Sequence, residues 1–225
     1  MAGLTYTTYK SALETLAAEQ ASDTNWTTIL PQVIDYAEAR IHRDLDILGL
    51  VVRDATQTLA ANTRDFALPT PTGGTWDIVT EINLLISSVR TPLIKVSLPT
   101  MNMLWPQATA PGTSSVPSYY AHVTDDDIVV GPPLGSAAGT ATVEVIGSIS
   151  PAALSSGNPT TYISTNYPDL MIAASMIFIS GYQKNFGSQS DNPQQAQSWE
   201  TQYRTLLAGA QKDEAARRGV PAPAG

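Results

Sequence analysis

Few residues in this chain are suited to acid–base or metal chemistry. The sequence has two histidines, His42 and His122, and no cysteine. A metal site or catalytic triad that includes histidine must therefore use one of these two side chains. His42 falls within a helical pattern and lacks the histidine or carboxylate partners of a known ligand motif, whereas His122 falls within a strand pattern. We expect both to be surface or interface residues.

The one carboxylate cluster is Asp125-Asp126-Asp127. Hard divalent cations prefer several oxygen ligands, so a cation site is one interpretation. The cluster lacks the alternating acids and the distal glutamate of a calcium loop, which favours a solvated turn between two strands. A hydrolase that uses Asp125–Asp127 and His122 remains an alternative. The sequence contains no nucleophile-elbow, zinc-protease, Walker or dinucleotide-binding motif, so we expect no enzyme, cofactor or metal.

Composition and charge restrict the partners of this chain. Its 225 residues carry a net charge of −8, and residues 66–165 contain 6 acids against 2 bases. Tight, sequence-independent binding to nucleic acid requires clustered Lys and Arg, and the sequence has no such cluster. The longest apolar stretch, 170–179, is too short to cross a bilayer, so we expect no membrane partner. An acidic wall would repel DNA and let it slide past without specific binding.

The pattern of residues 30–59 predicts an amphipathic helix that leads into a strand. Pro31 suits a first helical turn, apolar residues recur every three or four positions, and Gly49 is a typical residue at a helix end. A preceding helix over 4–21 would complete a helical hairpin. The composition then changes, with frequent Pro and Gly. Strands are predicted at 50–59, 75–87, 89–96, 116–123, 128–130 and 140–146, with a helical turn at 101–105.

Helical periodicity returns near the C-terminus. One helix is expected to start at Tyr167-Pro168-Asp169, with Asn166 as its cap, and to be apolar nearly all round up to residue 186. Another starts at Pro193, capped by Asp191 or Asn192. The predicted fold class is α+β: a four-helix bundle of two N-terminal and two C-terminal helices with an inserted antiparallel β-subdomain. The expected parts are an N-terminal helical hairpin (1–49), the β-subdomain (50–160), the C-terminal helices (161–217) and a flexible tail (218–225).

Several stretches together resemble the head-to-tail adaptor (connector) proteins of tailed phages, of the tail tubular protein A type. Residues 36–45, YAEARIHRDL, are similar to a helix motif of that family. Residues 116–120 with 128–133 resemble its strand pair, residues 143–145 with 158–159 resemble its last strand and the following loop, and 165–170 with 199–203 resemble its last two helices. The order and spacing match over most of residues 5–210. Asn166, where the family often has histidine, and the long 69–76 loop depart from the pattern.

The resemblance implies a structural role in the virion. Such adaptors form a ring, usually twelve-fold, between the portal protein and the tail nozzle or tube protein. They extend the DNA channel and provide the platform for tail attachment. The expected location is the virion neck, with the host cytoplasm as the site of assembly. The alternative is another neck or tail structural or binding module of the virion.

Two sets of residues are candidates for contacts with these partners. A ring requires heterologous contacts between copies of the chain. The candidates for this seam are charged residues of the second helix (Arg40, Arg43, Asp44 and Asp46), for which a solvated helix face is the favoured alternative. The resemblance also implies that the C-terminal segment docks on the portal. The candidates for that contact are Lys212, Arg217, Arg218, Val220 and Pro221.

Overall fold

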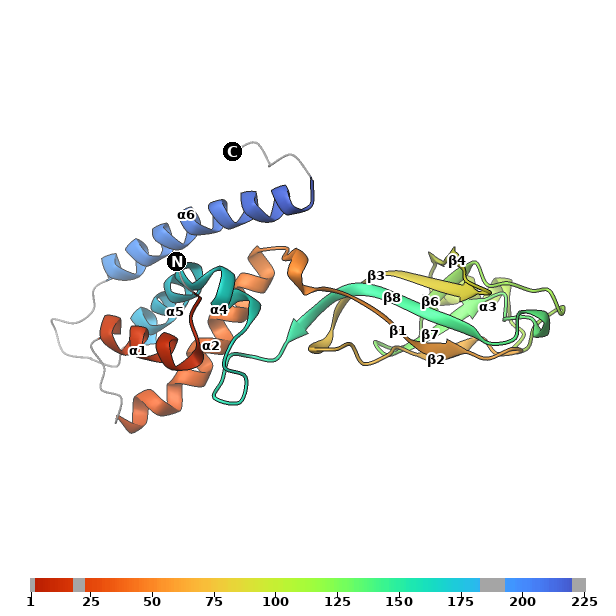
Figure 1. The fold of residues 1–225 in the computed structure, drawn as a ribbon, viewed down its shortest axis with the longest axis horizontal. Helices are drawn as coiled ribbons and strands as arrows, with labels where there is room; N and C mark the ends of the chain where they lie inside the picture. Colours follow the sequence, from red (N-terminus) through yellow and green to blue (C-terminus); the bar gives the residue numbers. More distant parts are fainter. Residues whose placement is uncertain (1–2, 18–22, 183–192, 220–225) are drawn as a thin grey trace. The chain divides into compact units, whose positions relative to one another are not determined.

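The computed structural model describes residues 3–17, 23–182 and 193–219, and shows a mixed α+β fold (Figure 1). The pairing in its two sheets is mainly antiparallel, and β5 with β6 forms a parallel pair. The chain divides into two compact units. The helical unit comprises residues 1–50 and 151–225, and the β-unit comprises residues 51–150. Each unit has its own buried apolar cluster. The β-unit is therefore an insertion between the two halves of the helical unit.

The helical unit is organised around α5, Pro168–Tyr182, whose side chains are apolar on nearly every face. This helix contacts α1, α2, α4 and α6. A helix that is apolar all round is stable only when neighbours cover it on several sides, and these contacts cover it. The other helices are α1 (Tyr6–Ala17), α2 (Thr24–Asp44), the short 3-10 helix η1 (Leu48–Leu50), α4 (Tyr162–Asn166) and α6 (Pro193–Arg217).

Helix α2 starts earlier and ends earlier than its sequence pattern predicts. Asp23 caps it, because its carboxylate accepts hydrogen bonds from the backbone amides of Asn25 and Trp26 at 2.7 and 3.3 Å. Pro31 consequently lies inside the helix and not in its first turn. The helix ends at Asp44, before Gly49, because Leu45 is extended. The expected apolar face is nevertheless buried.

In the C-terminal half of the helical unit, the helix starts also differ from those that the sequence predicts. Thr161 caps α4 in a capping box with Ser164. Asn166 does not cap α5, since its side-chain amide donates to the backbone carbonyl of Tyr162 at 3.0 Å. Pro168 and Asp169 do occupy the first turn of α5. Some expectations fall on residues that the structure does not describe. These are the caps Asp191 and Asn192, the end of the first helix after residue 17 and the end of α5 after residue 182.

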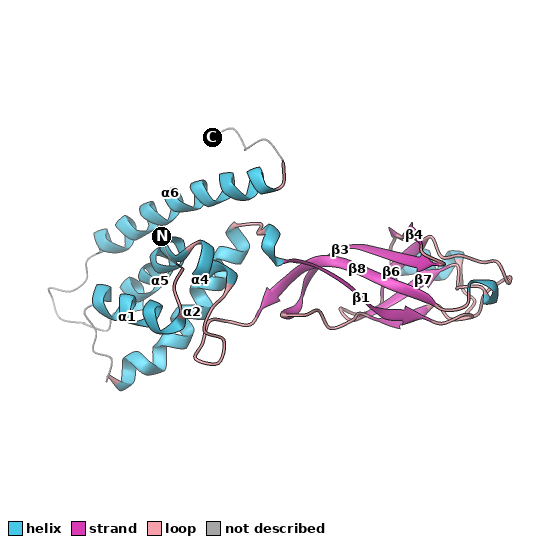
Figure 2. Cartoon of the chain, in the orientation of Figure 1, coloured by secondary structure: helices cyan, strands magenta, loops and turns pink. Residues whose placement is uncertain are grey.

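The β-unit consists of two four-stranded sheets (Figure 2). The first has the order β1-β8-β3-β4 and the second β2-β7-β6-β5. Their inner faces share a core that includes Leu59, Leu84, Val130 and Val143. The bounds are β1 (Val51–Leu59), β2 (Asp65–Ala67), β3 (Gly74–Ile86), β4 (Val89–Pro92), β5 (Ile94–Lys95), β6 (Tyr119–His122), β7 (Asp127–Gly131) and β8 (Ala141–Pro151).

Four features of the β-unit differ from the sequence expectation. The subdomain was expected to be antiparallel, but β5 pairs in parallel with β6. The strand expected at 89–96 is two strands, because the chain passes from one sheet to the other around Leu93. The three-residue strand β2 was not expected, since its run is too short to show alternation. The expected helical turn is the longer helix α3, Leu98–Leu104, capped by the hydroxyl of Ser97. The division at Leu93 matters most, because it leaves free strand edges on both sheets.

Candidate interaction surfaces

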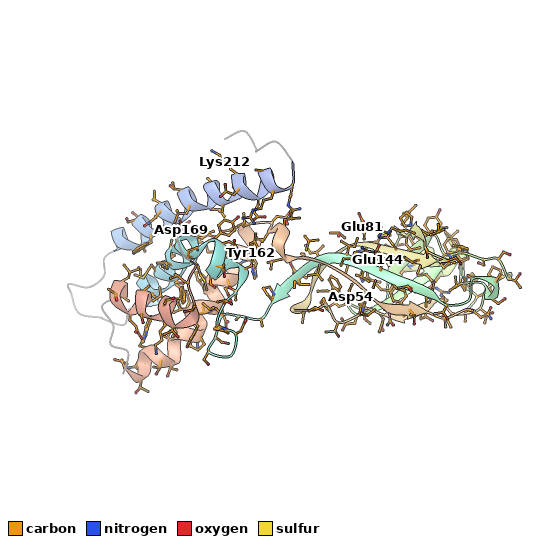
Figure 3. The ribbon with its side chains drawn as sticks, in the orientation of Figure 1. Asp54, Glu81, Glu144, Tyr162, Asp169 and Lys212 are labelled. Atoms are coloured by element: carbon orange, nitrogen blue, oxygen red, sulfur yellow. The ribbon has the colours of Figure 1, made fainter. Side chains whose placement is uncertain are left out.

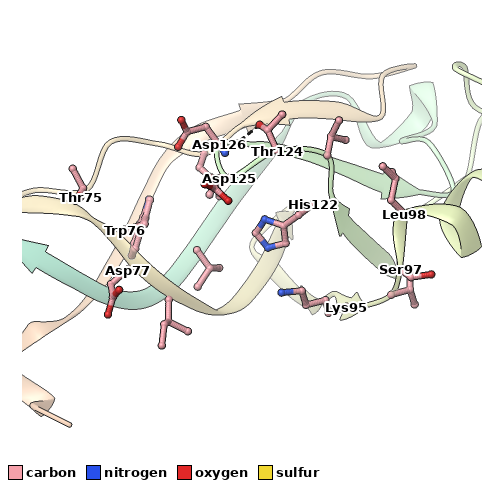
Figure 4. Close-up of a pocket in the computed structure, with 15 residues that line it drawn as sticks. Thr75, Trp76, Asp77, Lys95, Ser97, Leu98, His122, Thr124, Asp125 and Asp126 are labelled. Carbon is pink, nitrogen blue, oxygen red and sulfur yellow. Dashed lines mark hydrogen bonds between the residues drawn. The ribbon is translucent and has the colours of Figure 1, made fainter. Parts of the chain in front are cut away.

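A cavity of about 760 Å³ in the β-unit gathers several of the residues singled out from the sequence (Figure 4). His122 lies between Asp125 and Asp126 on one side and Lys95 on the other. Part of the lining is apolar and exposed, since Ile78 and Val123 are 60% and 50% exposed as residues. The cavity therefore combines carboxylates with exposed β-branched side chains.

Asp125 and Asp126 lie in the turn between β6 and β7, and Asp127 begins β7. The hydroxyl of Thr124 organises this turn, since it accepts from the amides of Asp126 and Asp127 at 3.3 and 3.0 Å and donates to the Asp127 carboxylate at 3.1 Å. Asp125 and Asp126 are exposed toward the cavity. Within the described ranges, no three side chains of the metal-binding types are grouped so as to hold an ion.

The environment of His122 favours its neutral form. Burial lowers the pKa of His122 below its usual value, and the nearby Lys95 ammonium lowers it further. A backbone hydrogen bond at Thr124 and the charge of Asp125 act in the opposite direction but do not outweigh the first two effects. At neutral pH the histidine therefore contributes an uncharged ring to a cavity whose charge comes from its aspartates.

The second surface of interest is the seam between α2 and α6 in the helical unit. Arg40 donates to both carboxylate oxygens of Glu200, at 2.8 and 2.9 Å, and its guanidinium lies over the ring of Tyr203. The Tyr203 hydroxyl donates to the Asp44 carboxylate at 2.8 Å. Burial tends to raise the pKa of Glu200, but hydrogen bonds from Arg40 and Arg204 outweigh it and lower the pKa. This network fastens α6 to α2.

The four charged residues expected at a ring seam thus differ in their surroundings. Arg40 and Asp44 belong to the network just described, and Asp46 pairs with Arg218 at 2.6 Å. Arg43 is exposed, and its Nε donates to the carbonyl of Ala39 in its own helix at 3.2 Å. Three of the four therefore contact α6 or the turn that follows it within one chain, and Arg43 is the one directed to solvent.

The structure describes three of the five residues that are candidates for the portal contact, and these three have different surroundings. Lys212 is exposed on α6 (Figure 3). Arg217 contacts Glu214 and the hydroxyl of Tyr162, and Arg218 contacts Asp46. Val220 and Pro221 lie outside the described residues. Because α6 extends to Arg217, residues 208–217 are already helical in the single chain.

A buried glutamate that the sequence analysis did not single out, Glu214, attaches the end of α6 to the rest of the helical unit. Its carboxylate accepts hydrogen bonds from the hydroxyls of Tyr167 and Tyr162, at 2.6 and 3.3 Å, and from the amide of Leu48 at 2.9 Å. Burial tends to raise the pKa of Glu214, but these hydrogen bonds and Arg217 lower it. Its spacing of four residues from the buried Ala210 is the signal that places it on the inner face.

A second missed carboxylate, Glu144, lies at the middle of β8 and is fully buried (Figure 3). Arg53 of β1 and Arg90 of β4 pair with it, the latter at 2.8 Å, and the amide of Asn83 donates to it at 3.1 Å. The glutamate thus links all four strands of the first sheet. A charged residue within an otherwise apolar strand pattern is the sequence signal for such a site.

Arg64 is a further buried charge of the β-unit that the sequence analysis did not single out. Its Nη1 donates to the carbonyls of Trp105 and Gln107 at 2.5 and 3.3 Å, and its Nη2 donates to Asn102 at 3.2 Å. These bonds hold the segment that follows α3. The guanidinium therefore has a structural role that spacing in the sequence does not reveal.

Residues 5–224 match a family model whose description is SU10 adaptor protein. The chain belongs to the SU10 adaptor protein family. No curated protein matches it. Because the match covers nearly the whole chain, both units of this adaptor belong to the family region.

The family defines this adaptor as a structural phage protein of the virion that contacts other virion proteins. Adaptors of this family are not known as enzymes, and the arrangement of His122 and its neighbouring aspartates gives no positive evidence of catalysis. Among the described residues, no helix has the length and apolar character that crossing a membrane requires.

Proposed function

We propose that this protein is a head-to-tail adaptor, of the tail tubular protein A type, that forms a ring between the portal protein and the tail nozzle or tube protein. The ring, a dodecamer in the virion, extends the DNA channel and serves as the platform for tail attachment. Assembly takes place in the host cytoplasm. The observation that carries the proposal is the family match over residues 5–224.

In this proposal α1, α2, α5 and α6 form one four-helix bundle that builds the ring. The contacts of α5 with the other three helices support the bundle. Arg43 is the seam residue of choice, since Arg40, Asp44 and Asp46 already have partners within the chain. The net charge of −8 suits a channel that DNA crosses without specific binding.

The portal contact is assigned to the end of α6 and the residues beyond it. Lys212 is exposed there, while Arg217 and Arg218 keep contacts with the helical unit. Deletion of the whole segment from Lys212 onward would also remove Glu214 and release α6. A deletion of residues 220–225 leaves Glu214 in place, and it should abolish portal binding while the helical signal in circular dichroism is retained.

The test is analytical ultracentrifugation of the full chain alone and mixed with the portal ring of the same phage. We expect a co-sedimenting complex with one copy per portal subunit. Arg43→Glu should prevent completion of the ring, whereas Lys10→Glu, a matched reversal on α1, should not. A folded protein that forms no complex with an intact portal would overturn the proposal and favour another neck or tail module.

A further inference from the structure

The cavity of the β-unit lies between two strand edges that have no strand partner within this unit, all of which is described. β4 pairs with β3 only over Asn83–Ile86, which leaves the Gly74–Glu81 part of β3 without a neighbour on that side. β5 is the last strand of the second sheet. Both edges belong to the wall of the same cavity, since residues 75–79 and Lys95 line it. The switch of the chain between sheets at Leu93 creates this arrangement.

The Gly74–Glu81 part of β3 has backbone groups that point toward its free edge. An ideal Cβ at Gly147 of β8 would lie 2.4 Å from the carbonyl oxygen of Ile78, so β8 packs closely against this part of β3 on one side. In antiparallel pairing, successive residues direct their backbone groups to alternate sides. Every second residue of the 74–81 stretch therefore directs its backbone N–H and C=O toward the free edge. Residues 75–79 of this stretch line the cavity.

The other wall is β5, which pairs in parallel with β6, and there too alternate residues direct their backbone groups to opposite sides. The amides of Ile94 and Val96 donate to the carbonyls of Ser118 and Tyr120, each at 2.9 Å. Lys95, which lies between them, consequently directs its backbone amide away from β6 and toward the free edge. An exposed row of backbone donors and acceptors is a template for an added strand.

The side chains around the edges define the partner that fits. The lining contains three aspartates (Asp77, Asp125 and Asp126) and one lysine, Lys95, so its charge is negative. Ile78 and Val123 expose 60% and 50% of their surface, and so offer apolar contact to one row of a strand's side chains. Opposite charge and apolar contact together favour a strand in which basic and aliphatic residues alternate.

We propose that this cavity is the docking site for an extended segment of a partner protein, with alternating basic and aliphatic side chains, which binds by adding a strand to the free edge of β3. The proposal depends on the proposed adaptor function in one respect, since the partner is taken to be a tail protein. The aspartates select the segment by charge, and the backbone groups on the free edge of residues 74–81 hold it.

The first test uses the full-length protein and a short fluorescein-labelled peptide in which Lys and Val alternate. We expect saturable binding in fluorescence anisotropy, and no binding of the counterpart with Glu in place of Lys. Methylation of alternate backbone nitrogens, which removes strand hydrogen bonds, should abolish binding. Equal binding of the Glu peptide or of the methylated peptide would overturn the proposal.

A matched pair of variants locates the site. The double variant Asp125→Asn/Asp126→Asn should weaken binding of the Lys–Val peptide by about fivefold or more, since each exposed charge contributes up to about 1 kcal/mol. Asp35→Asn/Asp213→Asn changes the net charge equally at exposed sites of the helical unit and should leave the affinity unchanged. Equal weakening in both double variants would show nonspecific attraction and overturn the proposal.

The outcome is separable from that of the proposed function. The Asp125→Asn/Asp126→Asn variant should co-sediment with the portal ring as the wild type does, because the portal contact is assigned to α6. Portal binding without peptide binding would overturn the docking site alone. Peptide binding without portal binding would overturn the proposed position at the portal and leave the docking site standing.

Discussion

The hydroxyl of Thr161 donates a hydrogen bond to the carboxylate of Glu38 at 3.0 Å, across 123 residues of sequence. The second oxygen of Glu38 accepts from the backbone amide of Leu154 at 3.1 Å. Both segments belong to the helical unit, and Thr161 also caps α4. Glu38 therefore fixes the point at which the chain re-enters this unit after the inserted β-unit.

Replacement of this acceptor should destabilise the helical unit. Glu38→Ala leaves a buried amide and a buried hydroxyl without their acceptor, and we expect a loss of roughly 2–4 kcal/mol in the free energy of unfolding. Asp35→Ala, an exposed acid on the same helix, should change it by less than about 0.5 kcal/mol. Urea denaturation followed by circular dichroism measures both. Equal effects of the two substitutions would contradict the assigned role.

The same residue should make stability depend on pH. Burial raises the pKa of Glu38 above its usual value, and the hydrogen bonds from Leu154 and Thr161 offset this only in part. The folded state therefore holds this proton at pH values where the unfolded state has lost it. Stability due to Glu38 is then complete below the usual pKa of about 4.3 and decreases as pH rises through the higher folded value. Relative to Glu38→Gln, the wild type should lose stability as pH rises over this range. A constant difference between the two would reject the raised pKa.

The charge network at Glu144 should contribute to the β-unit in a way that depends on salt. Glu144→Gln removes the ion pairs to Arg53 and Arg90, and we expect a loss of roughly 1–3 kcal/mol. Both arginine side chains are about half-exposed, so part of the coupling should disappear at roughly 1 M salt. A double-mutant cycle of Glu144→Gln with Arg90→Met measures this coupling. Glu81→Gln on β3 is the exposed control, and coupling no larger than that of Glu81 with Arg90 would reject the network.

His122 reports on the electrostatics of the cavity. Its pKa in an NMR titration should lie below the usual value of about 6.5, because of burial and then the charge of Lys95. Lys95→Met should raise this pKa, and Asp125→Asn should lower it further, since the aspartate stabilises the charged ring. Shifts of the same sign in the two variants would show that the ring does not lie between these groups.

The sequence predicts the packing faces of this protein well and its polar partners poorly. The period of Val33, Ala37 and Ile41 predicts the buried face of α2, because burial of an amphipathic helix depends on local spacing alone. Nothing local indicates that Arg40 binds Glu200, 160 residues away. The cavity likewise depends on how far β4 pairs with β3. That length is set by tertiary structure and not by alternation.

The start of α2 shows that a local sequence rule can predict the wrong helix boundary. Proline is common in the first turn of a helix, and Pro31 therefore predicted the start there. The carboxylate of Asp23 caps a helix that begins at Thr24, seven residues before Pro31. Burial of Trp26, Ile29 and Leu30 favours continuation of the helix through the proline. Tertiary packing thus outweighs the cost of an interior proline.

That cost can be measured by substitution. Pro31 is exposed and has no backbone N–H to donate to the carbonyl of Thr27, one helical turn earlier. Pro31→Ala restores this donor, and we expect a gain of about 1–3 kcal/mol and a rise of about 2–8 °C in Tm. Gln32→Ala, its exposed neighbour, controls for helix propensity and should shift Tm by less than about 2 °C. A decrease in Tm for Pro31→Ala would mean that the proline stabilises the protein by restricting the unfolded chain more than it weakens the helix.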